Sequence, residues 1–77
     1  MQLKSHYTDS HGQHQLPECL QFKTLAAGTY VLDDEQWYDE MDDAERDDVL
    51  RALDTLGIET ERDRDGLHVT SVPASAS

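Results

Sequence analysis

The chain has 77 residues, a formal net charge of −11 at pH 7 and one cysteine. A chain this short buries only about 60% of its unfolded surface, so it forms at most one domain with a thin core. The single cysteine excludes an internal disulfide and favours a reducing environment. No apolar run approaches the ~20 residues of a membrane span, and the N-terminus lacks a signal-peptide apolar region, so we expect a cytoplasmic protein without a membrane partner.

The acidity has a particular composition, with eleven Asp and six Glu against four Arg and two Lys. This usage resembles that of proteins from extreme halophiles, in which dense short carboxylates keep the chain hydrated while molar salt screens their repulsion. The alternative is functional, namely a carboxylate surface that imitates nucleic acid or meets a basic partner.

Three regions differ in composition. Residues 1–15 are polar and lack sustained periodicity, which predicts a mobile arm that contains histidines. Residues 16–72 carry the apolar patterns and are predicted to form the single domain. Residues 73–77 are small and polar, which predicts a disordered tail.

The stretch Pro17–Ala27 is ambiguous. A helical stripe would consist of Leu16, Cys19, Leu20 and Lys23, with Pro17 at the first helical position and Gly28 at the C-terminal cap. A strand would alternate Leu20, Phe22 and Thr24. We predict the helix and keep the strand as the alternative. Thr29–Leu32 is short and β-prone, which predicts a strand.

The stretch Asp33–Leu56 predicts two consecutive helices. Asp33 with Gln36, and Asp42 with Glu45, have the spacing of capping boxes. The first helix, Asp34–Glu40, has Trp37 as a core residue and Tyr38 as a possible contact. The apolar stripe of the second helix, Asp43–Leu56, consists of Val49, Ala52, Leu53 and Leu56. Trp37 and Met41 would lie off this stripe on one continuous helix, which indicates a break at Asp42, and Gly57 suits the second C-terminus.

The stretch Ile58–Val72 predicts a β-hairpin, because an Asp-Gly pair lies in the turn Asp63–Gly66 between two β-prone runs. The turn has the Asp spacing of the middle of a calcium loop. If Glu61 is the first position of such a loop, Val72 is the twelfth, where a bidentate Glu is needed. We therefore predict a turn and no calcium site.

The sequence contains residue types that serve metal binding and acid–base catalysis. A zinc site could in principle use His6, His11, His14 and Cys19, but their spacing matches no zinc pattern, and exposed histidines on an arm are the preferred interpretation. The carboxylate pairs stand at helix starts, where water prevents the pKa shift that acid–base catalysis needs. We therefore expect a non-enzymatic protein without a cofactor.

The predicted order is helix, strand, helix, helix and hairpin. This order, together with VLRALDTLGIETERDRDGLHV at Val49–Val69, resembles the winged helix-turn-helix superfamily. The resemblance implies an α+β fold, a small winged-helix-like domain in which helices are followed by a C-terminal β-hairpin. It also implies that Asp43–Leu56 is a recognition helix and that Arg62 and Arg64 lie at the tip of the wing.

Two functions follow as expectations for a small non-enzymatic regulatory protein, and adaptation to high salt belongs to the first of them. The first is DNA binding and transcription regulation, for which the candidate residues are Arg46, Arg51, Arg62 and Arg64. The alternative is an acidic nucleic-acid mimic or interaction module that binds a basic groove through Asp33–Asp48. Its candidate residues are Asp34, Glu35, Asp39, Glu40, Asp43, Asp47, Asp48 and Asp54. The outer face of the second helix, with three aspartates to one arginine, fits phosphate poorly. The thin core also predicts a homodimer that covers Phe22 or Leu50.

Overall fold

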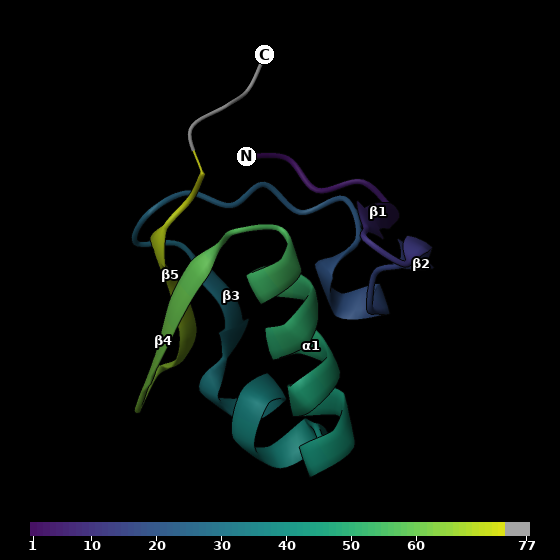
Figure 1. Cartoon of the computed structure of the whole chain (residues 1–77). Helices are drawn as coiled ribbons and strands as arrows, with labels where there is room; N and C mark the ends of the chain where they lie inside the picture. The colour runs from purple at the N-terminus through teal and green to yellow at the C-terminus, as the bar shows by residue number, and fades with distance from the viewer. Residues whose placement is uncertain (74–77) are drawn as a thin grey trace.

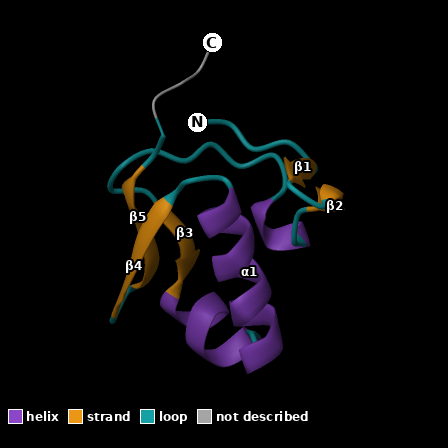
Figure 2. Ribbon diagram, viewed as in Figure 1, coloured by secondary structure: helices purple, strands orange, loops and turns teal. Residues whose placement is uncertain are grey.

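The computed structural model describes residues 1–73, so the predicted tail lies almost wholly outside the described residues. A three-stranded antiparallel sheet packs against one α-helix, and a separate two-stranded hairpin lies beside the helix (Figures 1 and 2). The strands are β1 (His6–Asp9), β2 (Gly12–Gln15), β3 (Tyr30–Asp33), β4 (Glu59–Asp63) and β5 (Gly66–Ser71). The helices are the 3₁₀ turn η1 (Glu18–Leu20), the π-helix η2 (Glu35–Glu40) and α1 (Asp43–Thr55).

The fold class is α+β, as predicted, but the predicted arrangement of helices followed by a hairpin is not what the structure shows. Three strands precede α1, and only the second half of the chain has the predicted order. The sheet order is β3-β5-β4, so β5 is the central strand.

The predicted hairpin is present as β4 and β5. Arg62 pairs with Leu67 and Asp63 with Gly66, which places the turn where the Asp-Gly signal indicated. Gly66 also pairs with Asp33 of β3, and it has a φ of +124°. A Cβ at Gly66 would overlap the carbonyl oxygen of Leu32. Glycine is therefore required here both for the backbone conformation and for the close approach of β3.

The core lies between the sheet and α1, and it extends under the N-terminal segment. Its buried members are Leu3, Leu16, Leu20, Leu25, Val31, Leu32, Trp37, Val49, Ala52, Leu53, Ile58, Leu67 and Val69. The predicted stripe of α1 is thus confirmed, with Leu56 packed at its margin. Trp37 is only 1% exposed, as predicted for a core residue.

The capping box at Asp42 and Glu45 is present, and Asp33 and Gln36 make the predicted reciprocal bonds, although the N-cap residue of η2 is Asp34. The Gln36 amide donates to the Asp33 carboxylate at 2.7 Å and the Asp33 amide donates back to the Gln36 side chain. Asp42 and Glu45 make the equivalent pair, with the Glu45 amide 2.8 Å from the Asp42 carboxylate. The backbone of Asp42 is extended, so the helical conformation is interrupted at the predicted residue.

The end of α1 is also the predicted one. Gly57 has a φ of +79° and donates to the Asp54 carbonyl, and Ile58 donates to the Leu53 carbonyl. These two bonds form a Schellman motif that satisfies the last carbonyls of the helix.

The predicted helix over Pro17–Ala27 is wrong. Only Glu18–Leu20 forms a 3₁₀ turn, and the chain then runs through Gln21 in an extended conformation and Phe22 at a φ of +62°. The amide of Leu3 donates to the Lys23 carbonyl, and Leu25 exchanges hydrogen bonds with Met1. Pairing with the N-terminal segment replaces the bonds that a helix would have made, so tertiary context overrides the local pattern.

The predicted mobile arm also has a different structure. Residues 1–3 run beside residues 23–25, with Leu3 buried, and the hairpin of β1 and β2 follows. The burial of Leu3 and the backbone pairing are the contacts by which this polar segment packs against the rest of the chain.

Candidate functional site

Most of the charge of the molecule lies at one end. The ten carboxylates of residues 33–48 are all exposed, and they belong to the end of β3, to η2 and to the first half of α1. In Figure 1 these elements lie at the end of the molecule opposite the N-terminus. We call this region, residues 33–48, the acidic end. It contains every predicted partner-binding carboxylate except Asp54, which lies farther along α1.

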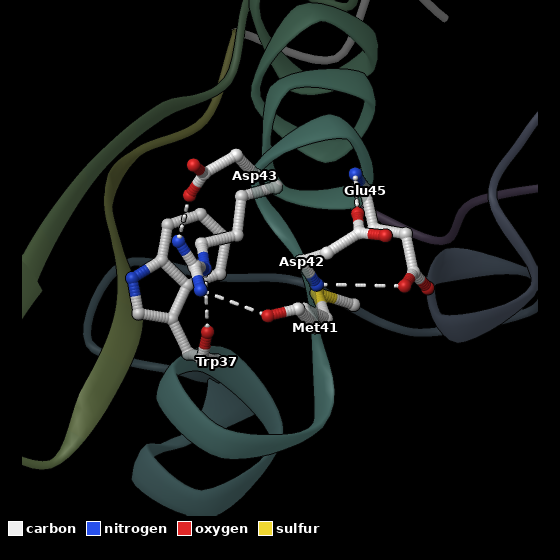
Figure 3. A network of polar contacts seen from close by, with 6 residues as sticks. Trp37, Met41, Asp42, Asp43 and Glu45 are labelled. Carbon is white, nitrogen blue, oxygen red and sulfur yellow. Dashed lines mark hydrogen bonds and ion pairs between the residues drawn. The ribbon is translucent and has the colours of Figure 1, made fainter.

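The one arginine of the acidic end, Arg46, faces the protein. Its Nε donates to the Trp37 carbonyl at 3.0 Å and its Nη2 donates to the Met41 carbonyl at 2.8 Å. Its Nη1 forms an ion pair with the Asp43 carboxylate (Figure 3). The side chain is only 28% exposed. The guanidinium therefore satisfies one carbonyl within η2, that of Trp37, and the carbonyl of its C-cap residue Met41, and it compensates little of the charge of the other carboxylates.

The other three arginines are exposed. Arg51 pairs with Asp47 one turn earlier on α1, at 2.8 Å, with both side chains about two-thirds exposed. Arg62 and Arg64 lie at the end of β4 and in the turn of the hairpin. Within residues 1–73 neither has a carboxylate within 4.0 Å of its guanidinium nitrogens, so their charge is available to a partner.

The four candidate metal ligands lie near the β1–β2 hairpin but do not converge. Tyr7 and His14 are cross-strand partners. His6 immediately precedes Tyr7 on β1, so its side chain faces the other side of the ribbon. His14 lies 2.9 Å from the Asp9 carboxylate, and burial raises the pKa of the Cys19 thiol. Among residues 1–73 no three His, Cys, Asp or Glu side chains are gathered so that they could hold a metal ion.

A polar cluster on the outer face of the sheet was not anticipated from the sequence. The Tyr30 hydroxyl donates to Asp63 at 2.8 Å, and the Tyr38 hydroxyl donates to the Asp63 carbonyl at 2.9 Å. The His68 ring lies 5.3 Å from the Tyr30 ring, and its Nδ1 is 3.2 Å from the same carboxylate without hydrogen-bond geometry. The bond to Asp63 raises the pKa of Tyr30 to about 12, and it lowers the pKa of Asp63.

This cluster holds the hairpin against the rest of the fold. Asp63 joins β4 to β3 and η2, and its carboxylate also accepts the Asp65 amide in the turn. The signal in the sequence was the Asp at the start of the turn, whereas its partner Tyr30 is 33 residues away. Tyr38, predicted as an exposed contact, is exposed but is already bonded to the hairpin.

A groove lies between the β1–β2 hairpin and the helices. Its walls include Tyr7, Asp9 and His14 on one side and Glu40, Glu45 and Asp48 on the other, with Met41 and Val49 between them. It combines apolar surface with carboxylates from both walls. It is therefore the concave part of the surface that adjoins the acidic end.

In comparisons with known proteins, no family model, no curated protein and no solved structure matches this chain. Within residues 1–73 no helix is both long enough and apolar enough to cross a membrane. The class of protein is consequently inferred from the geometry described above.

Proposed function

We propose that this protein is a small non-enzymatic regulatory module that binds a basic protein partner through its acidic end. The observation that carries the proposal is the uncompensated charge. Ten exposed carboxylates share one end of the molecule, and eight of them form no ion pair within residues 1–73, because only Asp43 and Asp47 pair with arginines. A partner surface rich in arginine and lysine, such as one that binds nucleic acid, is complementary to this charge.

The helix starts account for part of the acidity, because carboxylates in a first turn interact favourably with the helix dipole. Asp42, Asp43 and Glu45 belong to this group at α1. Asp39, Glu40 and Asp48 do not cap a helix, and they make no hydrogen bond within residues 1–73. These carboxylates support a role in binding beyond their contribution to the fold.

The arrangement of the second half of the chain supports a winged-helix-like module. β3, η2, α1 and the β4–β5 hairpin follow one another as the resemblance implies, and β3 joins the hairpin in one sheet. In this interpretation α1 takes the place of the recognition helix, and the hairpin is the wing. The segment before β3 lacks the helix that such a domain would have there.

A second candidate function is DNA binding in a protein adapted to high salt. The exposed, unpaired Arg62 and Arg64 at the hairpin tip favour it. The outer face of α1 disfavours it, because Asp47 neutralises Arg51 and because Asp48 and Asp54 would face phosphate. A homodimer remains part of both proposals, since Phe22 is 68% exposed and offers apolar surface to a second copy.

Fluorescence anisotropy with two labelled probes separates the two functions. We expect an oligoarginine peptide to bind, with an affinity that falls as KCl is raised, and duplex DNA not to bind. The double variant Asp34→Asn/Asp39→Asn should weaken peptide binding about twofold through lost charge. The matched double variant Glu59→Gln/Glu61→Gln, on β4, should leave it unchanged.

Two results would decide against the proposal. Binding of the duplex but not of the peptide would establish the DNA-binding candidate in its place. Binding of neither probe in low salt would exclude both candidate functions.

A titration of folding with KCl, followed by far-UV circular dichroism, tests the contribution of salt adaptation. Complete folding in low salt would leave partner binding as the better explanation of the acidity.

A further inference from the structure

The groove beside the acidic end has the chemistry of a site for one long basic side chain. Its lining includes two partly buried side chains with apolar surface, Tyr7 on the β1–β2 hairpin and Met41 after η2. Carboxylates line the groove from both the hairpin and the helices, with Asp9 on β1 and with Glu40 and Asp48 on η2 and α1. Apolar side chains flanked by carboxylates suit a ligand side chain with an aliphatic stem and a cationic head.

The hairpin wall of the groove is ordered by its own contacts. The Tyr7 and His14 rings are stacked, with centroids 5.5 Å apart and planes at 30°. The His14 ring is 2.9 Å from the Asp9 carboxylate, which also accepts a hydrogen bond from the His11 amide. The bond from His11 is the main reason why the pKa of Asp9 is lowered. These contacts hold the aromatic side chains of the wall in place before a ligand arrives, which reduces the entropy lost on binding.

The opposite wall keeps free carboxylates. Asp48 and Glu40 make no hydrogen bond or ion pair within residues 1–73, whereas Glu45 belongs to the capping box of α1. Arg51 also lines the groove, but Asp47 neutralises it. The free charge that a ligand meets on this wall is therefore negative.

We propose that this groove receives an arginine side chain from an extended basic segment of the partner. The inference rests on the proposed function and makes it more specific. A guanidinium is planar, and its edge can donate two parallel hydrogen bonds to a carboxylate while its face lies on an aromatic ring. An ammonium group is not planar and pairs with a carboxylate as a point charge, so arginine is expected to bind in preference to lysine.

Anisotropy with labelled oligoarginine and oligolysine peptides tests the proposal. We expect the groove variant Glu40→Gln/Asp48→Asn to weaken oligoarginine binding on the order of tenfold. The control variant Asp34→Asn/Asp39→Asn removes the same charge from the acidic end outside the groove and should cost only about twofold. The oligolysine peptide should respond about equally to both variants. None of the four side chains makes a hydrogen bond within residues 1–73, so the variants should keep the fold, which circular dichroism checks.

The cysteine supplies an independent measurement. Cys19 lines the groove, is half-buried, and is the single thiol of the chain. We expect saturating oligoarginine peptide to slow the reaction of Cys19 with a thiol reagent in the wild-type protein. Binding outside the groove would leave this rate unchanged.

The outcomes distinguish the two levels of inference. If both double variants weaken binding equally, or if the peptide binds without protecting Cys19, the groove assignment is wrong while the proposed function stands. If the oligoarginine peptide does not bind in low salt, the proposed function fails and the groove assignment fails with it.

Discussion

Removal of the Arg46 guanidinium should destabilise the fold rather than weaken binding. The group donates to the carbonyls of Trp37 and Met41, at 3.0 and 2.8 Å, and only 28% of the side chain is exposed. Hydrogen bonds that involve a charged group contribute about 1.5–3 kcal/mol each when buried, and the partial exposure reduces this value. The ion pair with the fully exposed Asp43 adds at most about 1 kcal/mol.

We therefore expect Arg46→Met, which keeps the aliphatic stem, to lower the free energy of unfolding by about 2–3 kcal/mol. The matched variant Arg51→Met removes an exposed pair and should cost less than about 0.5 kcal/mol. Urea unfolding can be followed by the fluorescence of Trp37, the single tryptophan. Equal destabilisation by the two variants would refute the structural role of Arg46. If Arg46→Met left stability unchanged but greatly weakened binding of the basic peptide, Arg46 would be a binding residue and not a structural one.

Three further predictions concern the backbone and the hairpin. Gly66→Ala should prevent folding, because the added Cβ would clash with β3. Gly12→Ala, at nearly the same φ but in open space, should lower the free energy of unfolding by only about 1–3 kcal/mol. Circular dichroism compares the two variants, and equal effects would exclude the clash. Phe22→Gly should be about 1 kcal/mol more stable than Phe22→Ala in urea unfolding, because only glycine relieves the positive φ; no difference would show that the residue is unstrained. The Tyr30–Asp63 bond should stabilise the fold below the ordinary tyrosine pKa of 10.0, and this contribution should be lost as the pH rises to about 12. The carboxylate contribution, with a lowered pKa, is present above 3.8 and is lost as the pH falls through the folded value. Tyr30→Phe should abolish the alkaline loss in pH-dependent unfolding, and an unchanged profile would contradict the assignment.

The second half of the chain was predictable because its signals are local. Each capping box joins residues three apart, as in Asp42 and Glu45, and the Schellman motif at Gly57 joins residues within one turn. The hairpin turn at Asp63–Gly66 is equally local. Short-range hydrogen bonds of this kind are specified by neighbouring residues, so the sequence predicts where these elements begin and end.

The candidate site was only partly predictable. The sequence placed the carboxylates on two short helices, and the structure brings the ten of residues 33–48 to one end of the molecule. The sequence could not show that Arg46 turns inward, since the carbonyls of Trp37 and Met41 point toward it only once η2 has formed. The groove also needs the β1–β2 hairpin, which the sequence presented as a mobile arm.

By itself, then, the sequence determined the break at Asp42, the apolar stripe of α1 and the C-terminal hairpin, because periodicity and caps act over a few residues. Tertiary structure alone decided the conformation of residues 1–28. There Leu25 bonds to Met1, 24 residues away, and Gly28 bonds to Val69 of the central strand. Such pairings depend on distant backbone groups that must find partners once buried, and a helical pattern yields to them when they form.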